Sequence, residues 1–329
     1  YWEFKTRHDV LEAGVFCTGQ FPEPLAFSAR VHHHLRSRLG DFDLVHDNQC
    51  LGYGIAKLEQ QIPLIVTLHH PITRDRMLEM DAAPNRFKRW SIGRWYGFVK
   101  MQGRVASQMP RVVVVSENSI QDIHTDMGVP LETMRLVPVG VDPDLFKPLD
   151  SVERIPGRLI TTASADVALK GLSYLVEAMA KLRADGRDIT LTIIGRPKPG
   201  KSMDLIDEYD LAPHIQFVSG VSDERIVELY DEAELAVVPS LYEGFSLPAI
   251  EAMCTGTPLV ATDGGALPEV TGTDGETVFR CRKGDADDLA ATIRDALANP
   301  DARARVGAAG RRRVLDRWTW RRCAQLTVE

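Results

Sequence analysis

The feature that most constrains this chain is a repeated alternation between short β-branched runs and longer amphipathic stretches. Runs such as Leu64–Leu68 have strand length, whereas Ala26–Arg38 repeats apolar residues at helical spacing. Because parallel strands need crossover connections, usually helices, this alternation predicts an α/β fold with parallel sheets. The predicted strands are Leu44–His46, Leu64–Leu68, Val112–Val115, Arg135–Val137, Leu159–Ala163, Thr190–Ile194, Ile215–Val218, Leu235–Val238, Pro258–Ala261 and Thr277–Phe279.

The alternation is interrupted once, by a segment rich in proline, glycine and polar residues that runs from Pro138 to Gly157. A chain of 329 residues suits two domains, so we expect domains at 1–148 and 149–329 with a ligand cleft between them. In the second domain the predicted helices are Gly171–Arg183, Asp223–Glu232, Pro248–Cys254, Asp285–Ala298 and Asp301–Asp316.

Composition narrows the class of protein. Hydrophobic residues make up 44% and charged residues 26%, as in soluble globular proteins, and the net charge of −7 argues against a nucleic-acid partner. The longest aliphatic run, Val112–Val115, is too short to span a bilayer. Scattered cysteines indicate a reducing cytosol without disulfides or a thiolate zinc site, so a cytoplasmic protein is expected. They are Cys17, Cys50, Cys254, Cys281 and Cys323.

The most informative stretch runs from Pro239 to Met253. A strand is expected to end at Val238, a loop follows, and Pro248 suits the first turn of a helix. Main-chain N–H groups of the four residues before Pro248, together with the helix dipole, would favour a phosphate there. The predicted donor-binding residues of this loop are Gly244, Phe245, Ser246 and Leu247.

Two glutamates of the same stretch could serve opposite ends of one ligand. A carboxylate accepts two hydroxyl hydrogen bonds, so Glu251 suits the two hydroxyls of a ribose. Glu243, nearer the phosphates, would face a transferred sugar. A Glu pair at this spacing is common by chance, and the surrounding pattern is what makes it informative.

With these motifs the sequence resembles the family-four glycosyltransferases (retaining, glycosyl transferases group 1). The resemblance covers nearly the whole chain and is densest from Leu159 to Thr271. It implies the GT-B fold, two facing Rossmann-like domains with parallel sheets and an inter-domain cleft, with a terminal helix near 311–329 crossing back to the first domain. The shared positions include Val115–Glu117, Gly140–Asp142, Lys170-Gly171, Pro239-Ser240, Glu243–Phe245, Leu247-Pro248, Glu251–Met253, Gly256, Pro258, Gly264-Gly265, Pro268-Glu269 and Trp318–Trp320.

The resemblance implies transfer of a sugar from a nucleoside-diphosphate donor to an acceptor hydroxyl with retention, without a metal or other cofactor. The implied catalytic residues are His69, Lys170 and Glu243, with Lys170 placing its charge on the diphosphate and His69 facing the transferred sugar. His70 is the competing histidine. The base is expected near Val218–Ser222, with Val221 among the donor-binding residues, and uridine, guanosine and adenosine all stay open. The acceptor stays open: a glycan, a lipid or a small molecule.

The chain departs from the family pattern at three places. An Arg expected before Lys170 is replaced by Ser164 or Ala165, so Arg196 is a candidate substitute in the phosphate site, and Ser164 adds a neutral donor. Val139 stands where Asn is usual. The family's first strand and Gly-rich loop would precede Tyr1 and span about 30 residues, so both ends of this chain are expected to be trimmed.

Other features of the first domain each have two interpretations. His46 and Asn48 follow a strand and would line the acceptor side, or form a polar surface turn. Segment 86–104 has interleaved basic and aromatic residues and no acidic residue. In one interpretation it contacts an anionic membrane or a phosphorylated lipid. In the other, its aromatic face packs on the core and its basic face is solvated. His32, His33 and His34 are consecutive and point apart on a helix, so a shared metal is not expected.

Two other functions compete with the transferase. A nucleotide-binding oxidoreductase would also use two Rossmann-like domains, but no G-x-G-x-x-G motif follows a strand. A non-catalytic or degenerate homologue would bind a sugar nucleotide without transferring the sugar, and the missing Arg keeps that alternative open.

Overall fold

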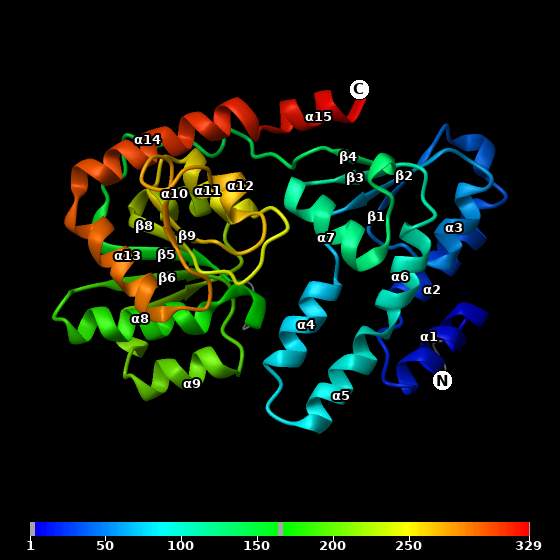
Figure 1. The fold of residues 1–329 in the computed structure, drawn as a ribbon, viewed down its shortest axis with the longest axis horizontal. Helices are drawn as coiled ribbons and strands as arrows, with labels where there is room; N and C mark the ends of the chain where they lie inside the picture. The colour runs from blue at the N-terminus through cyan, green and yellow to red at the C-terminus, as the bar shows by residue number, and fades with distance from the viewer. Residues whose placement is uncertain (1–3, 164–166, 329) are drawn as a thin grey trace. The chain divides into compact units, whose positions relative to one another are not determined.

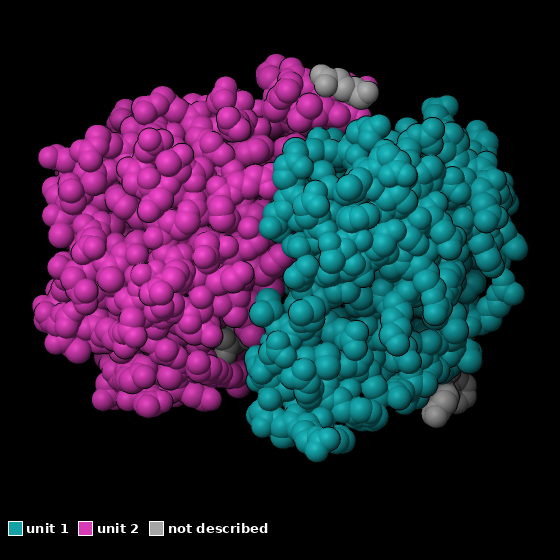
Figure 2. Space-filling model, in the orientation of Figure 1, with its two compact units in different colours: residues 1–137 teal, residues 138–329 magenta. Residues whose placement is uncertain are grey.

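The computed structural model describes residues 4–163 and 167–328, which form two compact units, unit 1 (residues 1–137) and unit 2 (residues 138–329) (Figure 2). The predicted linker start at Pro138 coincides with the first residue of unit 2. The domain boundary at 148 and the crossing of the terminal helix stay predictions. Each unit is a parallel sheet covered by helices (Figure 1), which confirms the predicted α/β class and the GT-B architecture.

Unit 1 contains a four-stranded parallel sheet in the order β1-β2-β3-β4. In β2 the side chains of Leu64, Val66 and Leu68 are buried and the two residues between them are half-buried, as expected of a strand with helices on both faces. The strands are β1 Val45–Asn48, β2 Leu64–Leu68, β3 Val112–Val114 and β4 Met134–Leu136. The helices are α1 Arg7–Cys17, α2 Glu23–Leu35, η1 Leu39–Asp41, α3 Tyr53–Glu59, α4 Thr73–Asp81, α5 Arg86–Trp95, η2 Tyr96–Phe98, α6 Val99–Ala106, α7 Glu117–Met127 and η3 Leu131–Thr133.

Unit 2 contains a six-stranded parallel sheet in the order β10-β9-β8-β5-β6-β7. The strands are β5 Ile155–Thr162, β6 Thr190–Ile194, β7 Ile215–Val218, β8 Ala233–Val238, β9 Leu259–Thr262 and β10 Phe279–Cys281. The helices are η4 Ala168–Lys170, α8 Leu172–Ala184, α9 Lys201–Glu208, η5 Ala212–His214, α10 Asp223–Glu232, α11 Leu247–Cys254, α12 Leu267–Thr271, α13 Ala286–Ala298, α14 Pro300–Arg317 and α15 Trp320–Val328. Strands β6 and β7 follow on one side of β5, and strands β8, β9 and β10 follow on its other side. The reversal places a topological switch point between β5 and β8, where ligands of such sheets usually bind.

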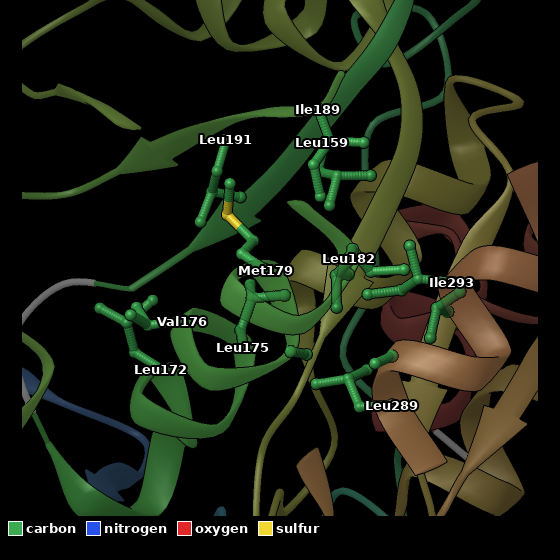
Figure 3. Close-up of a cluster of buried hydrophobic side chains, with 14 of the residues drawn as sticks. Leu159, Leu172, Leu175, Val176, Met179, Leu182, Ile189, Leu191, Leu289 and Ile293 are labelled. Atoms are coloured by element: carbon green, nitrogen blue, oxygen red, sulfur yellow. The ribbon is translucent and has the colours of Figure 1, made fainter. Parts of the chain in front are cut away.

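The core of unit 2 lies where α8 and α13 cover one face of its sheet (Figure 3). Leu175, Met179 and Leu182 repeat at helical spacing along α8 and are fully buried, and Ile293 of α13 joins the same cluster. Burying one such side chain contributes roughly 1.5–3 kcal/mol. This packing holds the strands whose carboxyl ends carry the candidate site.

Each predicted strand overlaps an observed strand: the bounds of Leu64–Leu68, Thr190–Ile194 and Ile215–Val218 are confirmed, and the other strands have shifted ends. The predicted strand at Leu159–Ala163 begins instead at Ile155, so the end of the expected linker is strand. Ile155 pairs with Ala233, and a register shift before Leu159 accommodates Gly157, whose φ is +74°. Helix α2 begins at Glu23 rather than Ala26, because Pro24 fits a first helical turn.

Candidate active site

Two loops meet at the switch point of unit 2, one after β5 and one after β8. The main-chain N–H of Leu241 donates to the carbonyl oxygen of Leu169 at 2.8 Å. Gly171 has φ +65°, and a Cβ there would overlap the carbonyl oxygen of Pro239. Only glycine fits this approach, so Gly171 docks the loop that carries Lys170 onto the loop that carries Glu243.

Lys170 and Glu243 form an ion pair across these loops. The Nζ of Lys170 lies 2.8 Å from Oε1 of Glu243, and the hydroxyl of Ser240 donates to the same oxygen at 2.7 Å. Glu243 is buried, with 7% of its surface exposed, whereas the Lys170 side chain is 28% exposed. A largely buried carboxylate held by a cation and a hydroxyl is fixed in orientation. Ser240 is a site residue that the sequence did not single out.

The loop after β9 holds the Glu243 loop from its other side. The N–H of Ala266 donates to the carbonyl oxygen of Glu243 at 2.8 Å, and Thr262 donates through its hydroxyl to the carbonyl oxygen of Ser240. A Cβ at Gly265 would overlap Glu243, so this glycine is needed for the close approach. The shared Gly264-Gly265 pair thus positions a carboxylate.

Helix α11 begins beside this pair, and its start offers hydrogen-bond donors to a ligand. Ser246 precedes the helix with φ +95°, a conformation that is unfavourable for a residue with a Cβ. Its hydroxyl is buried and has no hydrogen-bond partner among residues 4–163 and 167–328. With the first N–H groups of the helix, it forms a site suited to a phosphate oxygen. The chain continues into the helix through Leu247, whose side chain is 43% exposed.

Glu251 lies one turn into α11 and is half-buried. The Tyr230 hydroxyl lies 3.5 Å from its Oε2 and 3.2 Å from Oγ1 of Thr162. Burial raises the pKa of Glu251 to about 7, against a smaller opposing effect of Tyr230. A carboxylate with so few donors around it is suited to accept hydroxyl hydrogen bonds from a ligand. Tyr230 is a neighbour that the sequence gave no reason to select.

The remaining predicted donor residues contribute in different ways. Phe245 is buried, and its ring lies edge-on against that of Trp318, with ring centroids 5.3 Å apart. Its side chain therefore serves packing, which leaves its main chain as the part that could contact a donor. Gly244 is buried in the same loop. Arg196 is exposed after β6, and Val221 is half-buried between β7 and α10. Ser164 lies outside the described residues.

In unit 1, two predicted residues come together at the carboxyl edge of the sheet. The Nε2 of His69 lies 2.8 Å from Oδ1 of Asn48, and Gln49 accepts from the His69 N–H at 2.7 Å. Burial and then the neighbouring His70 lower the pKa of His69, so its imidazole is neutral at pH 7. His70 instead pairs with Asp75 at 2.8 Å.

His46 is not part of this pair. Its Nε2 lies 2.7 Å from Oγ1 of Thr67, on the neighbouring strand β2. Gln49 holds the turn by donating to the carbonyl oxygen of His70 at 2.9 Å. The residue has φ +63°, and no local sequence signal reveals this turn.

Segment 86–104 has features of both interpretations, because some of its aromatic side chains are packed and others are exposed. Trp95 and Phe98 pack against Phe21, with ring centroids 5.2 and 5.6 Å away. Phe87 and Trp90, however, are 75% and 57% exposed and stack on each other. The segment therefore has an apolar inner face and an aromatic outer one.

Within residues 4–163 and 167–328, no group of three or more His, Cys, Asp or Glu side chains is arranged to hold a metal ion. No helix in that part of the chain is long and apolar enough to cross a membrane.

Comparison with known proteins was consistent across the chain. Residues 153–313 match the family "Glycosyl transferases group 1", and residues 5–145 match "Glycosyltransferase Family 4". An MMP α-(1→4)-mannosyltransferase of Mycolicibacterium hassiacum is 46% identical over 99% of this chain and 79% of its own length. A GDP-mannose-dependent α-(1-6)-phosphatidylinositol monomannoside mannosyltransferase of Mycolicibacterium smegmatis is 30% identical over 66% of this chain and 61% of its own length.

Solved structures share the fold. Sucrose-phosphate synthase from Thermosynechococcus elongatus aligns with a TM-score of 0.72 at 24% identity, over 100% of this chain and 79% of that one. The Anabaena protein Alr3699/HepE in complex with UDP and glucose aligns with a TM-score of 0.72 at 18% identity, over 92% and 80%. With the paired loops of unit 2, these matches show that the chain belongs to the family-four glycosyltransferases (glycosyl transferases group 1), enzymes of the hexosyltransferase type with a GT-B fold.

Proposed function

We propose that this enzyme transfers a mannosyl group from a nucleoside-diphosphate donor to an acceptor hydroxyl, with retention and without a bound metal. The observation that carries the proposal is the Lys170–Glu243 pair beside the Ser246 hydroxyl, which has no hydrogen-bond partner in the described part of the chain. The sugar is suggested by the 46% identical relative, which is named as a mannosyltransferase. GDP is the expected nucleotide, because another relative is named as GDP-mannose-dependent.

The proposed donor site uses positive charge from the chain itself. The donor diphosphate would lie at the start of α11, against the Ser246 hydroxyl and main-chain N–H groups, with Lys170 as its cation. Lys170 now neutralises Glu243, so a bound diphosphate would share that cation and leave Glu243 free to accept from the sugar. Glu251 would accept from the ribose hydroxyls, and Val221 would lie near the base.

The proposed reaction breaks the bond between the anomeric carbon and the leaving phosphate oxygen. The acceptor oxygen forms the new glycosidic bond on the same face, and its proton passes to the leaving phosphate. Negative charge grows on that phosphate, so Lys170 and the α11 donors would stabilise the transition state. The neutral His69 imidazole would hydrogen-bond a hydroxyl of the transferred sugar.

Calorimetry with GDP, UDP and ADP, in the presence of a chelator, tests the donor site. We expect GDP to bind the wild type, Lys170→Ala and Glu251→Ala to bind it more weakly, and Lys181→Ala, which removes an exposed ion pair with Asp287, to bind normally. Transfer from GDP-mannose, with the product anomer assigned by NMR, tests the chemistry. Binding without transfer would support the non-catalytic alternative, and an absolute need for a divalent cation would overturn the metal-free proposal.

The outer face of α5 favours a lipid-linked acceptor over a small metabolite. Arg94 lies 5.4 Å from the Trp90 ring centre, and the exposed pair of Phe87 and Trp90 is flanked by cations, as on proteins that bind anionic membranes. Co-sedimentation with phosphatidylglycerol vesicles tests this contact. We expect a double Phe87→Ser, Trp90→Ser variant to lose binding, and the proposal fails if the wild type does not sediment.

A further inference from the structure

A second cavity, in unit 1, lies among α1, α2 and α3 and is not part of the site described above. Its volume is about 390 Å³. Among the described residues, six basic side chains line it and no carboxylate does. We call it the basic pocket and define it by Arg7, His8, His32, His33, Arg36 and Lys57.

The crossing of α2 and α3 fixes the position of this pocket. Ser28 of α2 is fully buried, its hydroxyl accepts from the N–H of Gly54 at 3.4 Å, and a Cβ at Gly54 would overlap the main chain of Ser28. His32 lies one turn beyond Ser28, and Lys57 lies about one turn beyond Gly54. The close contact therefore holds these two side chains on one wall of the cavity.

The positive charge of the pocket is not neutralised within the described chain. Among residues 4–163 and 167–328, no ion pair involves Arg7, Arg36 or Lys57. The nearby carboxylates of α1, Asp9 and Glu12, both pair with Arg30. Three permanent cations, all on solvent-exposed residues, thus line the pocket without a counter-charge among the described residues, and their mutual repulsion favours the binding of an anion.

The positive charges of the pocket also lower the pKa values of its histidines. Burial, and then Lys57 and Arg36, lower the pKa of His32, and Arg36 is the largest cause of the lowered pKa of His33. The rings of His33 and His8 lie 5.3 Å apart. From the other packed elements, Tyr53 of α3 lines the cavity, and Arg104 of α6 donates to the Tyr53 hydroxyl at 3.5 Å. No carboxylate among the described residues lines the cavity, so a bound anion would favour the protonated form of these imidazoles.

We propose that the basic pocket binds the phosphate group of a small phosphorylated molecule, at a site separate from the nucleotide donor site. Its volume falls within the range of about 300–1,000 Å³ that ligand pockets occupy. Lys57 and the two arginines provide charge-assisted donors for phosphate oxygens, and the imidazoles add donors once protonated. The same cations repel a metal ion, which agrees with the expectation that the consecutive histidines share none.

Phosphate and glucose 6-phosphate, titrated into the protein by calorimetry at constant ionic strength, test the proposal. Lys57→Gln and Arg36→Gln should each weaken binding about tenfold, because each removes one charge-assisted contact. Arg38→Gln is the matched control: it removes a cation near the end of the same helix that pairs with Asp41 instead. When the pH is lowered from 8 to 6, the wild type should retain more phosphate affinity than His32→Gln, because both proteins meet the same titration of the phosphate and only the wild type can protonate His32.

The outcomes separate this site from the donor site. Binding should persist with saturating GDP and in Lys170→Ala, and Lys57→Gln should leave GDP affinity unchanged, which also shows that the variant is folded. The proposal is overturned if soluble phosphates do not bind, if Arg38→Gln weakens binding as much as Lys57→Gln, or if only vesicles containing phosphatidic acid bind.

Discussion

Lys170 reaches Glu243 across the switch point of unit 2, with Nζ 2.8 Å from Oε1, although 73 positions separate the two residues in sequence. The pair exists because β5 and β8 are neighbours in the sheet and Gly171 lets their loops touch. Its position beside the start of α11 makes it the centre of the proposed donor site.

Lys170→Gln should lower mannosyl transfer by about 10²–10³-fold, since it removes the charge that would stabilise the leaving phosphate. It should also destabilise the protein by about 1–2 kcal/mol, because Glu243 keeps only its hydrogen bond from Ser240. Steady-state kinetics and urea denaturation measure the two effects. Lys181→Gln, which breaks the exposed pair with Asp287, should change neither.

Glu251→Gln should remove a pH dependence of stability. The folded pKa of Glu251, about 7, lies above its ordinary value of 4.5, so the folded state holds an extra proton between these values. Stability is therefore lost as the pH rises through this window, by up to about 3 kcal/mol. Urea denaturation at pH 5 and pH 8 should show that the free energy of unfolding of the variant, relative to that of the wild type, is higher at pH 8 than at pH 5. An equal gain for Glu228→Gln, an exposed carboxylate, would contradict this assignment.

GDP affinity should also depend on the titration of Glu251, but it should rise with pH, whereas stability falls. If Glu251 accepts from the ribose hydroxyls, it must be ionised, so the affinity of the wild type should rise with pH and level off above about pH 7. Calorimetry across pH 5.5–8.5 should show a flat profile for Glu251→Gln. A variant that keeps the slope of the wild type would place the ribose elsewhere.

Gly171→Ala should destabilise the protein by at least about 3 kcal/mol and weaken GDP binding, because the new Cβ overlaps the carbonyl oxygen of Pro239. Gly186→Ala is the control for backbone strain alone. Gly186 has φ +79° with open space around it, so its substitution should cost only about 1 kcal/mol. Thermal denaturation and calorimetry measure both variants, and equal costs would show that the loop contact is unimportant.

Asn48→Ala should lower kcat while leaving GDP affinity unchanged, because Asn48 orients the imidazole of His69 and would not touch the nucleotide. We expect a loss of about tenfold, typical of a residue that acts through another one. His46→Gln is the control on the same strand, since its ring contacts Thr67 instead. An unchanged kcat in Asn48→Ala would remove His69 from the proposed sugar site.

The sequence predicted what depends on neighbouring residues. Alternation of β-branched runs and amphipathic stretches indicated parallel sheets, because strand and helix periodicities are local. The Ser116 side chain caps α7, another local feature, since a cap forms between a residue and the turn that follows it. The motif from Pro239 to Met253 likewise indicated a loop and a helix start after a strand, which are β8 and α11.

The tertiary structure decided what depends on strand order and helix crossing. Tyr230, Ser240 and Gly265 acquire their roles only when β5, β8 and β9 become neighbours, which no local pattern encodes. The basic pocket is a similar case: consecutive histidines were visible in the sequence, but their convergence with Arg7 and Lys57 was not. Residues far apart in the chain are brought together by packing, because the free energy of burial depends on the whole fold and not on one segment.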